Sequence, residues 1–307
     1  MLKKYTGESA LLFTTVIWGG TFAIIKTALG SISPMMFLSF RFSIAAIIFL
    51  PFVIGRLKRL DIASIKGGLI LGFLYFGGFA AQTLGLNYTT ATKSAFITGT
   101  FVIFTPIFQI IIEKKLPGKG NIIGIILVAG GLLFLSSRGA HFLDVIHELG
   151  TNFNIGDYLT LICAVFYSLY IVYLDIVSKK IETLSLVFMQ IAVTAVGAIA
   201  GAIIFEASGI EVCRFILNKD VIFAVLYTSI LATILTTSLQ TKFQKYTTPA
   251  KAGIIFSLEP IFAFVVAFFL LSEKITNLGF IGCIFIFCGL LISEVMDKNN
   301  GKELRKS

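Results

Sequence analysis

The chain has 307 residues, of which 57% are hydrophobic and 13% are charged, and its mean hydropathy is +0.95. Soluble globular domains carry roughly 25% charged residues, so this composition excludes a soluble enzyme. The net charge of +9 comes from short basic clusters between apolar runs, with no folded domain to present them to a duplex. We therefore expect no nucleic-acid partner.

The apolar runs have the length and pattern of membrane-spanning helices. Such a helix uses about 20 apolar residues, whereas strands of membrane barrels alternate apolar and polar residues over about 10 positions. Runs such as residues 122–135 are continuous and do not alternate. We predict an all-α integral membrane protein with ten transmembrane helices. In chain order the expected spans are residues 10–29, 34–54, 67–86, 94–112, 121–136, 157–177, 184–205, 220–241, 252–271 and 276–293.

The basic residues are distributed unevenly between the two sets of loops. Most of the 25 lysines and arginines lie in the terminal segments and in the loops on the same side of the membrane as both termini. Cytoplasmic loops carry an excess of Lys and Arg. We therefore expect both termini to be cytoplasmic, in a multi-pass protein of the inner (plasma) membrane.

The chain contains an internal repeat. Residues 82–93 (QTLGLNYTTATK) align with residues 240–251 (QTKFQKYTTPAK), and a second register aligns Gly7, Glu8 and Trp18 with Gly156, Asp157 and Tyr167. Each unit contains five helices, and because five is odd, the second unit enters the membrane from the opposite side. The prediction is two inverted five-helix repeats, an arrangement used by many secondary transporters.

These boundaries give the expected domain organisation. It consists of a first repeat (1–136, helices 1 to 5), an external linker loop (137–156), a second repeat (157–296, helices 6 to 10) and a cytoplasmic tail (297–307).

Several motifs resemble one transporter family. They are WGGTF at 18–22, the run from residue 82 to 106 ending in FVIFTP, and SLEPIFAFVVAFFLLSE at 257–273. The chain is similar over nearly its whole length to the EamA-type ten-helix members of the drug/metabolite transporter superfamily. The resemblance implies export or uptake of small metabolites through a central cavity lined mainly by helices 1, 3, 4, 6, 8 and 9.

Charged residues inside the spans are costly and need a partner or a water-filled cavity. Glu259 lies deep in the ninth span, directly before Pro260, which is expected to kink the helix. It is either a ligand or proton site or a structural partner of a cation such as Arg41. For Arg41, which lies deep in the second span, we favour a structural ion pair over substrate contact.

The repeat also matches pairs of polar residues. Lys93 and Lys251 begin equivalent helices on opposite faces, either as entrance charges for anionic or zwitterionic substrates or as ordinary interfacial lysines. Gln82 and Gln240 either face the cavity or form hydrogen bonds between helices. The candidates for aromatic cavity walls are Trp18, Tyr75, Phe101, Tyr167 and Tyr170, although for any one of them we favour packing in the core or against lipid.

No cofactor or metal site is expected. The external loop holds His141, His147, Asp144 and Glu148, whose spacing is more typical of a solvated loop than of metal ligands. The sequence has no G-x-x-x-x-G-K-[ST] motif, so transport would draw on an ion gradient or on exchange.

The predicted function is secondary transport of small organic metabolites, amino acids or related compounds, across the inner membrane by alternating access. The expected partners are a small-molecule substrate, the lipid bilayer and a coupling ion or counter-substrate, and we expect a monomer. The alternative is an intramembrane enzyme acting on lipid or peptide substrates, but the chain shows no G-x-S-x-G or H-E-x-x-H motif.

Overall fold

The computed structural model describes residues 2–57, 60–135, 153–272 and 277–303. These residues form helices, with a single isolated bridge between Ile32 and Phe215 and no named strand. The prediction of an all-α protein is confirmed. The elements are α1 (Leu2–Ala28), α2 (Pro34–Leu57), α3 (Ile62–Tyr88), α4 (Ala91–Gly99), α5 (Phe101–Glu113), α6 (Lys119–Leu135), α8 (Ile155–Val177), α9 (Thr183–Ala207), α10 (Lys219–Leu226), the π-helix η1 (Tyr227–Leu235), α11 (Thr236–Phe243), the 3-10 turn η2 (Gln244–Tyr246), α12 (Pro249–Phe256), α13 (Glu259–Leu271) and α14 (Asn277–Glu303).

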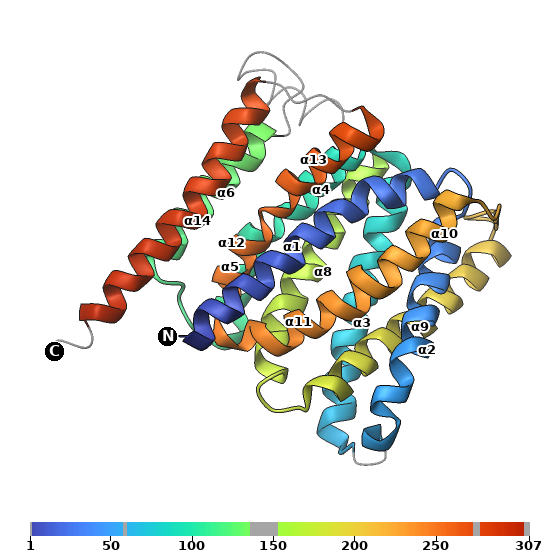
Figure 1. The fold of residues 1–307 in the computed structure, drawn as a ribbon, viewed down its shortest axis with the longest axis horizontal. Helices are drawn as coiled ribbons and strands as arrows, with labels where there is room; N and C mark the ends of the chain where they lie inside the picture. Colours follow the sequence, from blue (N-terminus) through green and yellow to red (C-terminus); the bar gives the residue numbers. More distant parts are fainter. Residues whose placement is uncertain (1, 58–59, 136–152, 273–276, 304–307) are drawn as a thin grey trace.

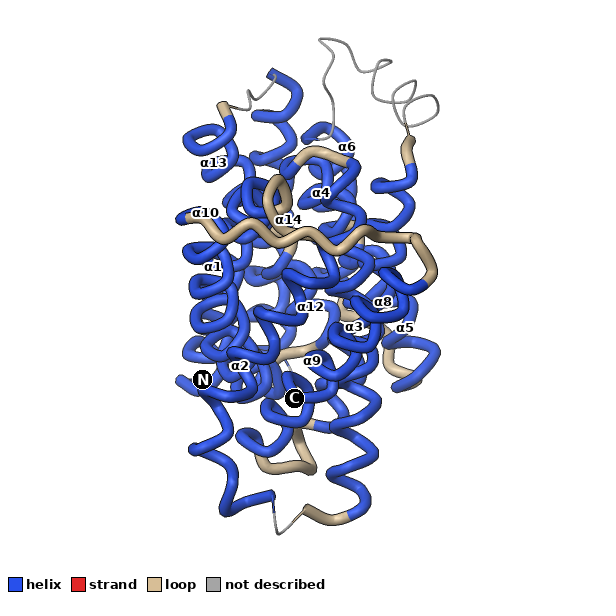
Figure 2. The backbone as a smooth tube through the Cα atoms, turned by 90° about the vertical axis from the view of Figure 1, so that its right-hand side faces the viewer, coloured by secondary structure: helices blue, strands red, loops and turns tan. Residues whose placement is uncertain are grey.

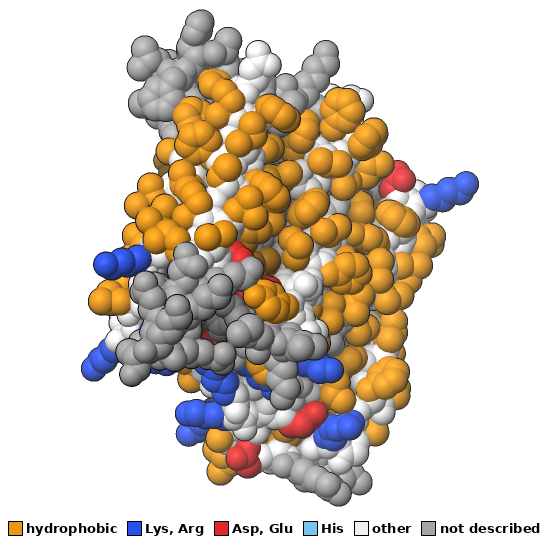
Figure 3. Space-filling view, turned by 60° about the vertical axis from the view of Figure 1, so that its left-hand side comes forward, with side chains coloured by type: hydrophobic (Ala, Val, Ile, Leu, Met, Phe, Trp, Pro, Cys, Tyr) orange, Lys and Arg blue, Asp and Glu red, His pale blue; other side chains and the backbone are white. Residues whose placement is uncertain are grey.

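The helices match the ten predicted spans. Within the described residues, 9 helical segments are long and apolar enough to cross a membrane, and the shorter apolar helix Lys119–Phe134 occupies the place of the predicted fifth span. Hydrophobic side chains cover most of the face seen in Figure 3, and its charged side chains gather mainly toward the lower part. Such a surface suits contact with lipid.

The helices form one bundle. Helix α1 begins and α14 ends at the same end of it, which we call the terminal face (Figure 1). The loop between α9 and α10 is at the opposite face. It runs extended beside the start of α10 (Figure 2) and is held by a bond from the Ser33 amide to the Arg214 carbonyl, at 2.9 Å.

Contacts between the halves follow the repeat. Helix α2 packs against α9 and α6 packs against α14, so equivalent helices of the two units meet each other. At the second of these contacts, a Cβ on Gly131 would lie 2.6 Å from the Gly282 carbonyl oxygen, and a Cβ on Gly124 would lie 2.8 Å from that of Gly289. The repeat equates Gly124 with Gly282 and Gly131 with Gly289, so the two contacts are copies of one another. This reciprocity is what two inverted repeats produce.

Residues 136–152 lie outside the described residues, so most of the predicted linker 137–156 stays a prediction, and α8 begins at Ile155, within its last residues. The histidines and acidic residues at 141, 144, 147 and 148 also lie outside them. Within the described part, no group of three His, Cys, Asp or Glu side chains is placed to hold a metal ion.

The orientation of the bundle is testable by cysteine labelling. Val212, 83% exposed in the loop at the opposite face, and the exposed Lys180 at the terminal face would each be replaced by cysteine in a cysteine-free background. We expect a membrane-impermeant maleimide added to intact cells to label Val212→Cys and to label Lys180→Cys only after permeabilisation. The reverse pattern would contradict cytoplasmic termini.

Candidate functional site

A small cavity lies between the helices of the bundle. Its volume is about 30 Å³, room for one or two water molecules. It is lined by Trp18, Thr21, Tyr75, Phe79, Gln82, Phe101, Tyr167, Tyr170, Ile171, Gln240, Phe256 and Glu259. These residues come from α1, α3, the fourth span, α8, the eighth span and the ninth span, the helices that the family resemblance implies.

Two broken helices contribute to this cavity. The fourth span breaks at Thr100, between α4 and α5, and the ninth span breaks at Ser257 and Leu258, between α12 and α13. The repeat equates Phe101 with Glu259, and each is the first residue after its break. Discontinuous helices near the midplane form the substrate sites of many transporters with inverted repeats.

Aromatic rings form most of the cavity wall, and all five aromatic candidates are among the lining residues. The ring centroids of Trp18 and Phe256 are 5.3 Å apart, and those of Tyr75 and Phe79 are 4.6 Å apart. The polar atoms of these rings are bonded to the protein. The Trp18 indole donates to Thr236 Oγ1 at 3.0 Å, and the Tyr75 hydroxyl lies 2.7 Å from Thr237 Oγ1.

The two matched glutamines both line the cavity. Gln82 also bonds between helices, because its amide donates to Thr98 at 3.3 Å and its oxygen accepts from the Tyr167 hydroxyl at 3.2 Å. Gln240 donates to Gln244 Oε1 at 2.9 Å, while its own Oε1 is buried and has no hydrogen-bond partner. Gln82 therefore both faces the cavity and forms hydrogen bonds between helices, whereas Gln240 has an unused acceptor, its Oε1, beside the cavity.

Glu259 is the acidic residue of the cavity wall. It is 7% exposed, and its carboxylate forms no hydrogen bond or ion pair within the described part of the chain. The expectation of a kink at Pro260 is confirmed, since α13 starts at Glu259.

The prediction that Arg41 forms a structural ion pair is wrong for the residues that the structure describes. Its fully buried guanidinium donates to Thr233 Oγ1 at 2.9 Å and to the Ala232 carbonyl at 3.0 Å, and it lies 4.4 Å from the centre of the Phe79 ring. The π-helical segment η1 explains why. Its wider turns change the regular α-helical bonding of carbonyls such as Ala232, so main-chain and hydroxyl dipoles replace a carboxylate as partner.

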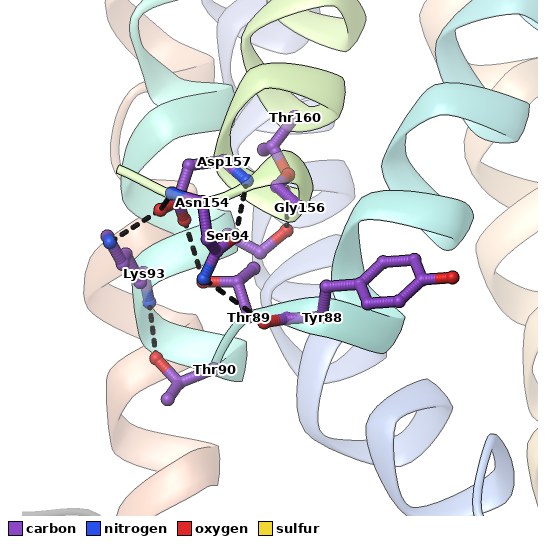
Figure 4. A network of polar contacts seen from close by, with 9 residues as sticks. All are labelled: Tyr88, Thr89, Thr90, Lys93, Ser94, Asn154, Gly156, Asp157 and Thr160. Atoms are coloured by element: carbon purple, nitrogen blue, oxygen red, sulfur yellow. Dashed lines mark hydrogen bonds and ion pairs between the residues drawn. The ribbon is translucent and has the colours of Figure 1, made fainter. Parts of the chain in front are cut away.

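Lys93 lies at the opposite face, outside the cavity lining. Its ammonium contacts the Asp157 carboxylate at 2.6 Å, and the Asp157 side chain is fully buried (Figure 4). The other oxygen of that carboxylate accepts from the Thr89 hydroxyl at 2.8 Å. The pair joins α4 of the first repeat to α8 of the second.

Lys251 lies near the terminal face, also outside the cavity lining. Its side chain is 2% exposed and contacts Glu8 of α1 at 2.7 Å and Glu294 of α14. Both lysines contact buried or largely buried carboxylates, and the choice between entrance charges and ordinary interfacial lysines stays a prediction. An ammonium buried at the start of a helix opposes the helix dipole and needs such a partner.

The two ion pairs are copies of one another under the repeat. Lys93 corresponds to Lys251, and Asp157 corresponds to Glu8. Their distances are 2.6 and 2.7 Å. Each carboxylate precedes a cavity aromatic on its own helix, Tyr167 or Trp18, by about 15 Å at 1.5 Å per residue. The pairs therefore lie toward opposite ends of the cavity.

Sequence reasoning missed the acidic partners of these pairs. The repeat had already aligned Glu8 with Asp157 and Lys93 with Lys251, so either contact, once known, would have predicted the other. Glu294 has no equivalent signal, because its contact depends on how α14 packs.

Comparisons with known proteins agree with this architecture. The EamA-like transporter family matches residues 5–137 and 154–294. An uncharacterised transporter of Archaeoglobus fulgidus is 32% identical over 95% of this chain and 86% of its own length. A probable amino-acid metabolite efflux pump of Escherichia coli is 25% identical over 95% of both chains. A solved crystal structure with 14% identity has the same fold, with a TM-score of 0.71 over 94% of this chain and 97% of its own. The chain belongs to the EamA-like transporter family.

Proposed function

We propose that this membrane transporter is a secondary transporter that moves small organic metabolites across the inner membrane by alternating access, with the central cavity as its substrate site. One observation carries the proposal. A small, partly polar cavity lies between two ion pairs that the inverted repeat relates to each other. Opening one pair at a time would expose the cavity to one side of the membrane and then to the other.

The substrate class is proposed on weaker similarity. The Escherichia coli relative is named for amino-acid metabolites, and amino acids and related compounds are therefore the first candidates. Such molecules are larger than the 30 Å³ of the cavity, so binding requires the cavity to widen. Energy would come from a coupling ion or a counter-substrate, and we expect the monomer to suffice because the cavity is built from one chain.

Flux into proteoliposomes tests the proposal. We expect saturable uptake of a labelled amino-acid metabolite that an unlabelled excess competes away. Thr21→Trp, which fills the cavity from α1, is expected to abolish this uptake, whereas Thr27→Trp on an exposed position of the same helix keeps it.

The competing function has a different outcome in the same preparation. An intramembrane enzyme would hydrolyse or modify a lipid or peptide without saturable flux. Turnover of such a substrate, together with an absence of flux for the whole metabolite panel, would overturn the transport proposal.

A further inference from the structure

We infer that the cavity recognises an organic ammonium ion that carries N–H donors and an apolar or aromatic body. This substrate class rests on the proposed transport function. The inference comes from the hydrogen-bonding groups that the cavity wall leaves unused.

The unused polar groups are acceptors. The Glu259 carboxylate has no partner within the described residues, and Gln240 Oε1 is buried without one. Leaving a buried acceptor unsatisfied costs about 1–3 kcal/mol, and more for a charged group. A ligand that supplies N–H donors and a positive charge would satisfy both groups.

Each donor group in the cavity wall already has a hydrogen-bond partner in the protein. The side-chain amides of Gln82 and Gln240 donate to Thr98 and Gln244, and the Trp18 indole donates to Thr236. No Lys or Arg side chain is among the described residues that line the cavity. An anionic ligand would therefore meet the Glu259 carboxylate, whereas the Arg41 guanidinium, whose Nη1 has no hydrogen-bond partner, lies over the Phe79 ring and is not among the lining residues.

The break in the ninth span gives a further reason to expect a cationic ligand. The N-terminal end of a half-helix carries partial positive charge and often binds an anionic group of a substrate. In the ninth span that end, at the start of α13, carries Glu259 itself, so the protein supplies the anion. The equivalent position in the fourth span is Phe101, which leaves one carboxylate in the cavity instead of two.

The aromatic wall suits a cation for a second reason. The faces of Trp, Tyr and Phe rings attract cations within about 6 Å of the ring centre. The ring centroids of Trp18 and Phe256 are 5.3 Å apart, whereas the Phe79 ring already contacts the Arg41 guanidinium. A ligand with both a cationic end and an apolar body fits such a lining.

Trp18 makes the test direct, because it is the only tryptophan of the chain and lines the cavity. Purified protein would be titrated with three probes of similar size, 2-phenylethylamine, 2-phenylethanol and phenylacetate, while the Trp18 fluorescence is followed. We expect saturable quenching by the amine, with an affinity about 10- to 100-fold higher than that of the alcohol, and no saturable binding of phenylacetate. This comparison needs no variant.

Substitution of Glu259 tests whether its carboxylate causes the preference for the amine over the alcohol. Glu259→Gln is expected to reduce the affinity for the amine to that for the alcohol, whereas the matched control Glu206→Gln, an exposed carboxylate at the opposite face, leaves the preference unchanged. Thermal unfolding of both variants checks that they fold. Retention of the preference by folded Glu259→Gln, or equal binding of alcohol and amine by the wild type, would overturn the inference.

The failures of the two proposals are distinguishable. Saturable binding and flux of phenylacetate or of the alcohol, without the amine, would leave the transporter in place and reject the ammonium class. Absence of flux for every compound in either direction would reject the transport function itself.

Discussion

Replacement of Lys251 by methionine is expected to open the bundle at the terminal face. Lys251 contacts both Glu8 and Glu294, and all three side chains are largely buried. Removing one partner of a buried ion pair costs roughly 3–5 kcal/mol. A cost of about 3 kcal/mol that falls only on the state closed at this face corresponds to a shift of about a hundredfold toward the state open there.

Accessibility of the cavity measures this shift. A cysteine at Thr21 in a cysteine-free background would be treated with a membrane-impermeant thiol reagent, added from one side of oriented vesicles. We expect Lys251→Met to raise its reaction rate from the terminal face about a hundredfold and to slow net flux. Lys93→Met is expected to raise the rate from the opposite face, by a smaller factor, because the Lys93 side chain is 23% exposed and its pair is weaker.

Two controls distinguish a lysine whose ion pair closes the cavity from a lysine that only attracts substrate to the surface. Lys251→Arg keeps the charge and should keep the wild-type rate, and Lys242→Met removes an exposed charge nearby. A lysine that merely attracts substrate would change the half-saturation constant from its own side, and that effect would shrink at high salt. If the reaction rate of the cysteine at Thr21 were unchanged from both faces in Lys251→Met and Lys93→Met, these ion pairs would not control access to the cavity.

Periodicity and internal similarity were enough to predict the architecture. All ten spans occur where the apolar runs predict them, and the inverted relation of the halves follows from the odd number of helices in each repeat. These features are local or depend on a comparison of the chain with itself. They therefore need no knowledge of packing.

The cavity was predictable in part for the same reason. Trp18 and Tyr167 were matched by the repeat, as were Gln82 and Gln240, and all four line the cavity. The sequence does not distinguish Phe79 and Phe256 from other phenylalanines, because phenylalanine is common throughout this chain. A phenylalanine in the cavity wall differs from one that faces lipid only after the helices pack.

Partner choice was not predictable from single spans. Arg41 has no carboxylate partner within the described residues because the π-helical segment opposite it offers the Ala232 carbonyl. The break in the fourth span was also unmarked, since it occurs at Thr100 while Pro106 lies inside α5. Both features arise from backbone geometry that side-chain patterns do not encode.

The contact between α6 and α14 leads to the second prediction with a large effect. Gly131→Ala is expected to destabilise the protein by about 1–3 kcal/mol, the usual cost of overpacking. The reason is that the new Cβ would lie 2.6 Å from the Gly282 carbonyl oxygen and 2.9 Å from the Ile286 amide nitrogen, which are backbone atoms that cannot turn away.

Gly130 provides a matched control one residue earlier in the same helix. A Cβ there would meet only the Phe285 ring, at 4.0 Å, so Gly130→Ala is expected to be neutral or to stabilise the helix by about 0.5–1 kcal/mol. Thermal unfolding of both variants in detergent gives the comparison. Gly289→Ala tests the repeat, because its Cβ would lie 2.7 Å from the Gly124 carbonyl oxygen and its loss of stability should match that of Gly131→Ala. Equal stability of Gly130→Ala and Gly131→Ala would show that α6 and α14 separate easily and that the pseudo-twofold contact does not hold the two repeats together.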